Sequence, residues 1–220
     1  MNRLKPLFCV AALFLLAGCA ANKPSHYYTL MPSSLSAGQP AAAAAPKPQA
    51  SAAGYAISVE AVALPEQVDR PQIVITDPAS TQVMPLGDSL WAAPLPHEIQ
   101  NALSDALSRR LGVLDVAATG IPDTLPVWRV LVRVQRFESL YNQQALLDAT
   151  WRLTPVNQGS KPSMICRGET GVPVQPGMSA LVAGHQQALS NLADVIAEQI
   201  RSGQTQVASQ KVNLKGCTFS

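Results

Sequence analysis

The chain has 220 residues, of which 47% are apolar, and its formal net charge is +2. Without Arg3 and Lys5, which lie in an N-terminal segment expected to be removed, 14 basic side chains balance 14 acidic ones. A neutral mature chain lacks the electrostatic footprint of a nucleic-acid-binding protein, so we expect no nucleic-acid partner. The apolar fraction is sufficient for one sizeable core, and the chain beyond residue 54 has the length of one domain.

Residues 1–18 have the layout of a secretory signal peptide. A start with two basic residues precedes the apolar stretch 7–16, and the small residues Ala17 and Gly18 follow it. The apolar stretch is shorter than the roughly 20 residues that a transmembrane helix needs. We therefore expect removal of residues 1–18, rather than a short membrane anchor or a buried helix.

The end of this segment, Leu-Ala-Gly-Cys at 16–19, resembles the bacterial lipobox. The resemblance implies a diacylglyceryl group on the Cys19 sulfur, cleavage before this cysteine and acylation of the new amine, for example with palmitate. Several acyl chains hold a protein firmly to a membrane, whereas one chain holds it marginally. Because Ala20 stands where an aspartate would favour the inner membrane, the resemblance implies an anchor in the outer membrane, facing the periplasm.

The remaining cysteines are a candidate disulfide. Cys9 leaves with the signal peptide, so Cys166 and Cys217 are left over in the mature chain. In an oxidising periplasm we expect them to form a bridge that ties the C-terminal tail to a strand. The alternative is two independent thiols, with Cys166 buried and Cys217 on a loose tail.

Residues 33–54 consist mainly of Ala, Pro and Ser and separate two predicted strands. Such a segment cannot bury enough surface to offset the entropy of ordering, so we expect a flexible or partly extended spacer. Before it, residues 26–30 (HYYTL) are predicted to form a short strand docked on the body. Because strand faces alternate, we expect one of Tyr27 and Tyr28 in the core.

After the spacer, alternating residues predict further strands. A strand that ends at Pro65 is predicted from Ile57, Val59, Ala61 and Ala63. A hairpin is predicted around the turn signal DPAS, with strands over 71–76 and 81–86.

Helical periodicity follows over 95–111 and 179–201. An antiparallel meander with one solvent-exposed face is predicted between these helices, over 127–138, 145–154 and 164–170. The element order predicts an α+β fold: a single mixed, largely antiparallel sheet with two main helices packed on one face. The chain thus divides into a signal peptide, a lipidated segment with strand and spacer, and an α/β domain: residues 1–18, 19–54 and 55–220.

Three motifs behind the lipobox resemble the ABC-type transport auxiliary lipoproteins, the PqiC-like family. They are YYTL at 27–30, LPEQVDRPQIVI at 64–75 and DSLWAAPLPHEIQNAL at 88–103. The resemblance implies an outer-membrane component that works with an MCE-domain protein and an inner-membrane transport component in lipid trafficking and envelope integrity. The chain would then be a docking module held by its acyl chains in outer-membrane lipid. A ring-shaped partner also makes a homo-oligomer an option.

Such a docking module needs an exposed partner surface and a flexible tether. The spacer would supply this tether if the N-terminal strand were only loosely docked. Two alternatives remain: a carrier with an apolar pocket for an acyl chain, and a periplasmic hydrolase with a polar dyad or triad in a cleft.

The chain carries little material for catalysis, and we expect no enzyme, no cofactor and no metal site. None of the three histidines, His26, His97 and His185, has a second ligand three or four residues away. No G-x-S-x-G motif or phosphate-binding loop is present in the sequence. His185 lies on the apolar side of its predicted helix, where a core histidine is the ordinary interpretation.

Three residues are candidates for partner contacts. Trp91 precedes a predicted helix, where an indole most often wedges between helix and sheet. Asp69 and Arg70 precede Pro71 and most often fix a turn. A partner contact is the alternative role for each of the three.

Overall fold

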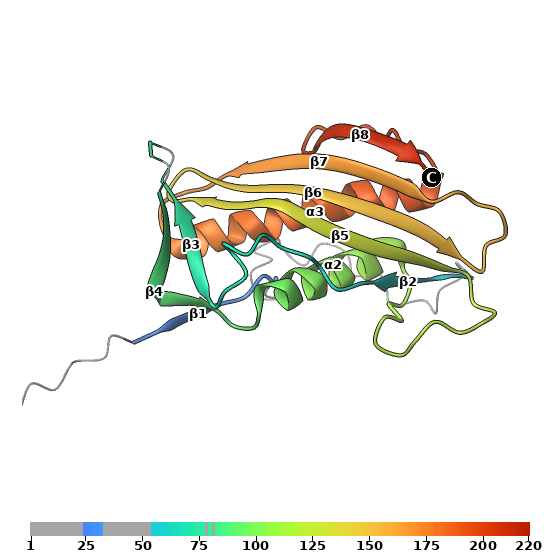
Figure 1. Cartoon of the computed structure of the whole chain (residues 1–220), viewed down its shortest axis with the longest axis horizontal. Helices are drawn as coiled ribbons and strands as arrows, with labels where there is room; N and C mark the ends of the chain where they lie inside the picture. Colours follow the sequence, from blue (N-terminus) through green and yellow to red (C-terminus); the bar gives the residue numbers. More distant parts are fainter. Residues whose placement is uncertain (1–23, 33–53, 78, 81) are drawn as a thin grey trace, which may run out of the picture.

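The computed structural model describes residues 24–32, 54–77, 79–80 and 82–220. The predicted signal peptide, Cys19 and the spacer over 33–53 lie outside the described residues. In the described part, two helices cover one face of an open mixed sheet of eight strands (Figure 1). The predicted α+β class is therefore confirmed. No helix in this part of the chain is long and apolar enough to cross a membrane.

The predicted three-strand antiparallel meander is present, and a fourth strand extends it, so that each of four consecutive strands pairs with the next. They are β5 (Val127–Leu140), β6 (Gln144–Val156), β7 (Met164–Pro173) and β8 (Asn213–Phe219). Alternate side chains of β5 and β6 are buried as predicted, among them Val130 and Trp151. β8 is an addition to the prediction. It is an edge strand that buries little, so its sequence lacks a clear alternation.

A β-bulge between Val134 and Arg136 changes which residues of β5 face the core. From Trp128 to Val134, before the bulge, the buried positions are even-numbered. After it they are odd-numbered, and Phe137 and Ser139 are buried. An extra residue in one strand shifts the two-residue period in this way. The bulge therefore places a hydroxyl in the core.

The other four strands lie on the other side of β5. These are β1 (His26–Tyr28), β2 (Ala56–Val59), β3 (Gln72–Thr76) and β4 (Val83–Trp91). β3 and β4 form the predicted hairpin, while β1 pairs in parallel with the end of β4 and β2 with the start of β5. β4 runs beyond its predicted end at Leu86 to Trp91, because β1 supplies a partner for its last residues.

β2 is shorter than predicted. The strand expected to run through Ala63 ends at Val59, and all four of its residues are buried. Beyond it Ala61 and Ala63 are exposed and Val62 is buried, the reverse of the expected alternation. The Val62 side chain is larger than those of the neighbouring alanines and fills the core, so even-numbered rather than odd-numbered residues of this segment face inward. The chain still follows β5, because the Ala63 amide donates to the Val132 carbonyl at 3.3 Å.

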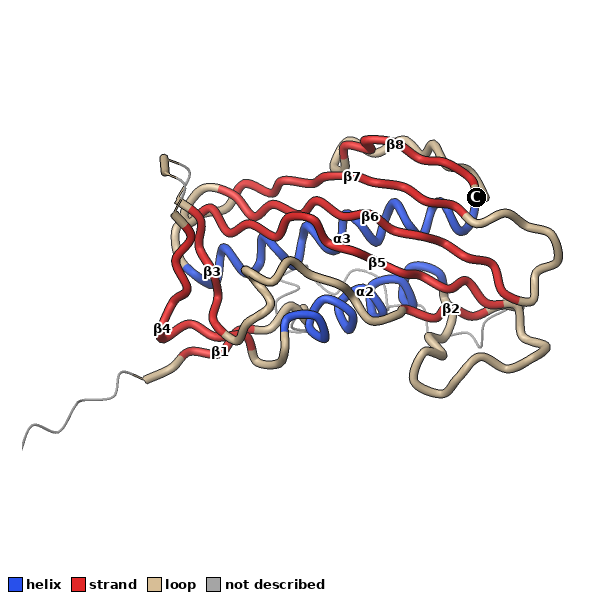
Figure 2. The backbone as a smooth tube through the Cα atoms, viewed as in Figure 1, coloured by secondary structure: helices blue, strands red, loops and turns tan. Residues whose placement is uncertain are grey.

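Both helices lie on the same side of the sheet (Figure 2). α2 (Leu95–Leu111) and α3 (Met178–Ser202) agree with the predicted ranges to within one residue at each end. Each ends at a glycine with a left-handed backbone, Gly112 with φ 67° and Gly203 with φ 68°, as helix C-caps commonly do. The two helices also contact each other, so one core lies between them and the sheet.

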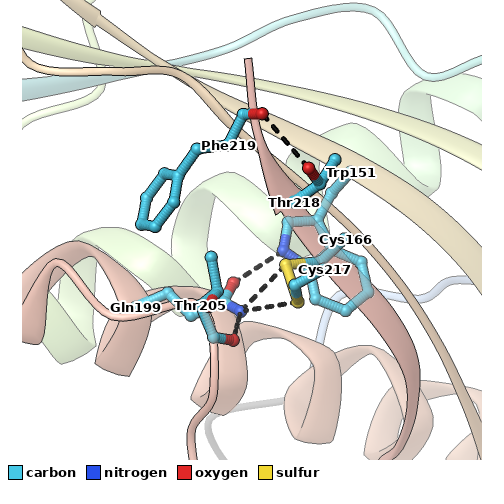
Figure 3. The surroundings of a disulfide bond; sticks show 7 residues. All are labelled: Trp151, Cys166, Gln199, Thr205, Cys217, Thr218 and Phe219. Atoms are coloured by element: carbon cyan, nitrogen blue, oxygen red, sulfur yellow. Dashed lines mark hydrogen bonds between the residues drawn. A yellow bond between two sulfur atoms is a disulfide. The ribbon is translucent and has the colours of Figure 1, made fainter.

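The structure joins Cys166 of β7 to Cys217 of β8 in a disulfide (Figure 3). The two residues stand directly opposite each other in the strand register. Gln199 of α3 is fully buried beside them and donates to the Cys166 sulfur at 3.2 Å and to the Thr205 carbonyl at 2.9 Å. Its Oε1 accepts a hydrogen bond from Trp151 Nε1 at 2.8 Å. Cys217 is therefore part of the sheet and not on a loose tail.

Replacing Cys217 by serine should lower the free energy of unfolding by about 2–4 kcal/mol, because the bridge closes a long loop in the unfolded chain. Urea unfolding of the periplasm-derived protein measures this loss. A reducing agent should lower the stability of the unmodified protein similarly and leave Cys217→Ser unchanged. A reducing agent without effect on the unmodified protein would contradict the prediction.

Candidate functional site

The segment nearest to Cys19 is docked on the body. β1 places Tyr28 opposite Trp91, and Leu30 is fully buried in the core. Tyr27 points outward, whereas Tyr28 packs against the core, as the predicted alternation requires. The N-terminal strand is therefore anchored through both backbone pairing and apolar burial.

Glu98 holds this segment in place. It lies in the first turn of α2 and is only 5% exposed. Its Oε2 accepts hydrogen bonds from Thr29 Oγ1 and from the Leu30 amide, each at 2.7 Å. A carboxylate is also stabilised at a helix N-terminus by the helix dipole. Both donors thus bind a charged acceptor, which gives stronger hydrogen bonds than a neutral one.

A second contact comes from α3. Gln186 Nε2 donates to the carbonyl of Thr29 at 3.0 Å and to that of Met31 at 3.3 Å. We call Glu98, Gln186 and residues 29–31 the N-terminal clamp. Sequence analysis did not find Glu98, because an acidic residue in the first helical turn is common and needs no distant partner.

The position of the clamp shows which segment of the chain links Cys19 to the body. Only six residues lie between Cys19 and His26, and they span at most about 25 Å. The spacer over 33–53 comes after the clamp in the chain, so it is not the link between Cys19 and β1. The condition of a loosely docked N-terminal strand is therefore not met, and the predicted short strand is docked on the body.

The face of β5–β8 opposite the helices carries a charge network, which we call the charged sheet face. Asp148 lies at its centre. Its neighbours Leu147 and Ala149 face the core, so Asp148 points to the opposite face, yet it is fully buried there. Arg167 donates to both carboxylate oxygens at 2.9 and 2.8 Å, and Lys215 Nζ lies 3.0 Å from Oδ2. Hydrogen bonding from Arg167 outweighs burial and holds the pKa of the Asp148 carboxyl below its usual range. The network joins β6, β7 and β8.

A serine and a histidine meet inside the core. Ser139 Oγ lies 2.8 Å from His185 Nε2, and the imidazole stacks on Phe137 with 4.0 Å between ring centroids. Burial lowers the pKa of His185 to about 3, so the ring is neutral. The pair is sealed from solvent, whereas the hydrolase alternative requires a pair that opens into a cleft. This pair therefore has a structural role.

The three residues predicted as candidates for partner contacts lie in two places. Trp91 is 4% exposed and packs edge-on against Phe137, so its ring belongs to the core, in agreement with the wedge interpretation, and offers little surface for the alternative partner contact. Asp69 and Arg70 are exposed in the turn before β3, where they are accessible to a partner. Within the described ranges, no three His, Cys, Asp or Glu side chains are grouped to hold a metal ion.

Two hollows lie near β8. The larger, about 570 Å³, is open and lies between β7 and the mostly polar loop 206–212. The smaller, about 290 Å³, is a shallow depression at the disulfide strands, lined by residues such as Ile165 and Gly216. Neither is an enclosed apolar cavity of the kind that would shield an acyl chain, so neither favours the carrier alternative.

Replacing Glu98 by alanine should lower the free energy of unfolding by about 1–3 kcal/mol, because the buried Leu30 amide and the part-buried Thr29 hydroxyl lose their acceptor. Hydrogen exchange at the Leu30 amide should also become faster. Glu198→Ala, which removes an exposed carboxylate of α3, is the matched control and should change stability by less than about 0.5 kcal/mol. Unchanged exchange at Leu30 in Glu98→Ala would refute the clamp.

The buried His185 should make stability depend on pH. Between pH 6.5 and about 3 the unfolded chain binds a proton that the folded chain does not. Stability should therefore fall on acidification through this range by about 1.4 kcal/mol per pH unit from this group alone. His185→Gln should lose this part of the slope in urea titrations at several pH values, whereas His97→Gln, at an exposed histidine, should retain it. Equal slopes in both variants would contradict the assignment.

Comparison with known proteins gives a family and a fold. The sequence profile of the ABC-type transport auxiliary lipoprotein component matches residues 34–197. No curated protein matches the sequence. A crystal structure of an uncharacterized protein is similar at a TM-score of 0.58 and 19% identity, covering 81% of this chain and 99% of the other. Protein XCC0632 from Xanthomonas campestris, described as DUF330, is similar at 0.50 and 15% identity, over 68% and 86%.

At these identities the two structures show that the fold is shared. The family is shown by the profile, which spans roughly three quarters of the sequence. This chain belongs to the ABC-type transport auxiliary lipoproteins.

Proposed function

We propose that the protein is a lipid-anchored component of the outer membrane that faces the periplasm and serves as a docking module for an MCE-domain protein in an ABC-type lipid transport system. The N-terminal clamp is the observation that carries this proposal. It fixes the body within about 25 Å of the acylated Cys19, so an anchor at this cysteine positions the whole domain at the membrane.

Family membership supports a role in transport and not in catalysis. The described residues add two surfaces that a partner protein can reach. One is the exposed pair Asp69 and Arg70, and the other is the charged sheet face, where Leu131 is 46% exposed. We place the partner contact at Asp69 and Arg70, because neighbouring opposite charges on a turn orient a polar partner without costly burial.

Replacing Cys19 by serine should leave the protein unprocessed and remove it from the outer-membrane fraction, because the thiol that takes the diacylglyceryl group is lost. Cys9→Ser is the matched control, since Cys9 leaves with the signal peptide and its variant should fractionate normally. Fractionation and intact-mass measurement give the result. Normal processing of Cys19→Ser would overturn the lipid anchor.

Photocrosslinking in cells should identify the partner. A photoreactive residue in place of Arg70 should capture an MCE-domain protein, and one in place of Leu131 is the matched control on the charged sheet face. Capture of the MCE-domain protein only from position 131 would move the contact to that face and refute the assignment of Asp69 and Arg70. Failure to capture it from either position would contradict the docking role.

A further inference from the structure

One end of the molecule collects exposed apolar side chains from strands that are distant in sequence. Val83 and Met84 start β4 and stand opposite Thr76 and Ile75 of β3. Those two residues in turn pair with the last residues of β5, which Tyr141 follows directly. Val83, Met84 and Tyr141 are 46%, 53% and 40% exposed. Neighbouring strands therefore bring three exposed apolar side chains to one end.

The N-terminal segment lies at the same end. β3 and β4 lie at this end of the molecule and run transverse to the long strands (Figure 1). β4 then leads to Leu90, which pairs with Tyr27 of β1, a residue that is 67% exposed. Since β4 has nine residues, its two ends are about 26 Å apart. We call this surface, with Tyr27, Val83, Met84 and Tyr141, the apolar end.

We propose that the apolar end rests on the lipid bilayer, with these four side chains in its interfacial region. The proposal rests on the proposed acylation of Cys19. The chain between Cys19 and β1 reaches at most about 25 Å, whereas β5 alone is about 43 Å long. An anchor of this length holds the apolar end, and not the opposite end, next to the membrane. Tyrosines are enriched at such interfaces because they join an apolar ring to a polar hydroxyl.

The chemistry of this end favours lipid over strand pairing with a second copy. Beyond its last three residues, the outer edge of β4 has no strand beside it in the described part of the chain. Pro85 in this stretch has no amide to donate, and such an edge resists pairing with another chain. Asp77, at the hairpin tip, already accepts hydrogen bonds from the Ala79 amide at 2.9 Å and from Ser80 Oγ at 3.0 Å. Its charge is therefore engaged within the turn.

Depth measurement by fluorescence quenching tests this orientation. In the mature protein Cys19 is acylated and Cys166 is bonded to Cys217, so Met84→Cys introduces the only free thiol. The full mature protein is labelled there with nitrobenzoxadiazole and reconstituted into phosphatidylethanolamine–phosphatidylglycerol vesicles that contain doxyl-labelled lipid. Leu114→Cys is the matched control. It is an apolar position, 74% exposed, next to β2 at the opposite end of β5.

Quenching should be at least about threefold stronger at position 84 than at position 114, and Tyr141→Cys should behave like Met84→Cys. Equal quenching at the two ends, or none at 84 and 141, would overturn the orientation. Flotation of the same vesicles separates the two proposals. A protein that floats without quenching at 84 and 141 retains its anchor and loses only the orientation, whereas a protein that does not float refutes the anchor and the orientation together.

Discussion

Two short hydrogen bonds to the buried Glu98 carboxylate fix the N-terminal segment on the domain. Glu98 joins residues 29–30 to the first turn of α2, and Leu30 beside them fills the core. Without this contact, the three-residue strand β1 would be held only by its backbone pairing with β4, by the burial of Leu30 and by Gln186. The contact makes residues 29–30 part of the domain. The position of the proposed lipid therefore becomes a property of the fold.

The two faces of the sheet are stabilised by different interactions. On the helix side, apolar packing encloses a few polar groups in fixed pairs, such as Ser139 with His185 and Trp151 with Gln199. On the opposite face, Asp148 is buried under the basic side chains that pair with it. Removing these basic side chains would leave a buried carboxylate unpaired, which is costly even where the ion pairs themselves add little. The charged side chains of this face therefore stabilise the fold, because they pair with the buried Asp148.

The division of the molecule into ends follows from these contacts. The clamp, the β3–β4 hairpin and the turn after β5 lie at one end, and β2 and the start of β5 lie at the other. With the proposed anchor at one end, the long sheet and the far end would remain accessible to other proteins. This arrangement suits a transport auxiliary lipoprotein, whose family membership rests on the profile match over 34–197.

The sequence by itself determined the two helices, the three-strand meander and the β3–β4 hairpin, because each has a strong local periodicity. It did not reveal the bulge in β5, the end of β2 at Val59 or the edge strand β8, since these depend on which distant residue fills the core or completes a ladder. Glu98 acquired its role only when folding brought Thr29 and Leu30, almost seventy residues away, to the start of α2. Local pattern thus specified the elements, and long-range packing decided where the N-terminus is held.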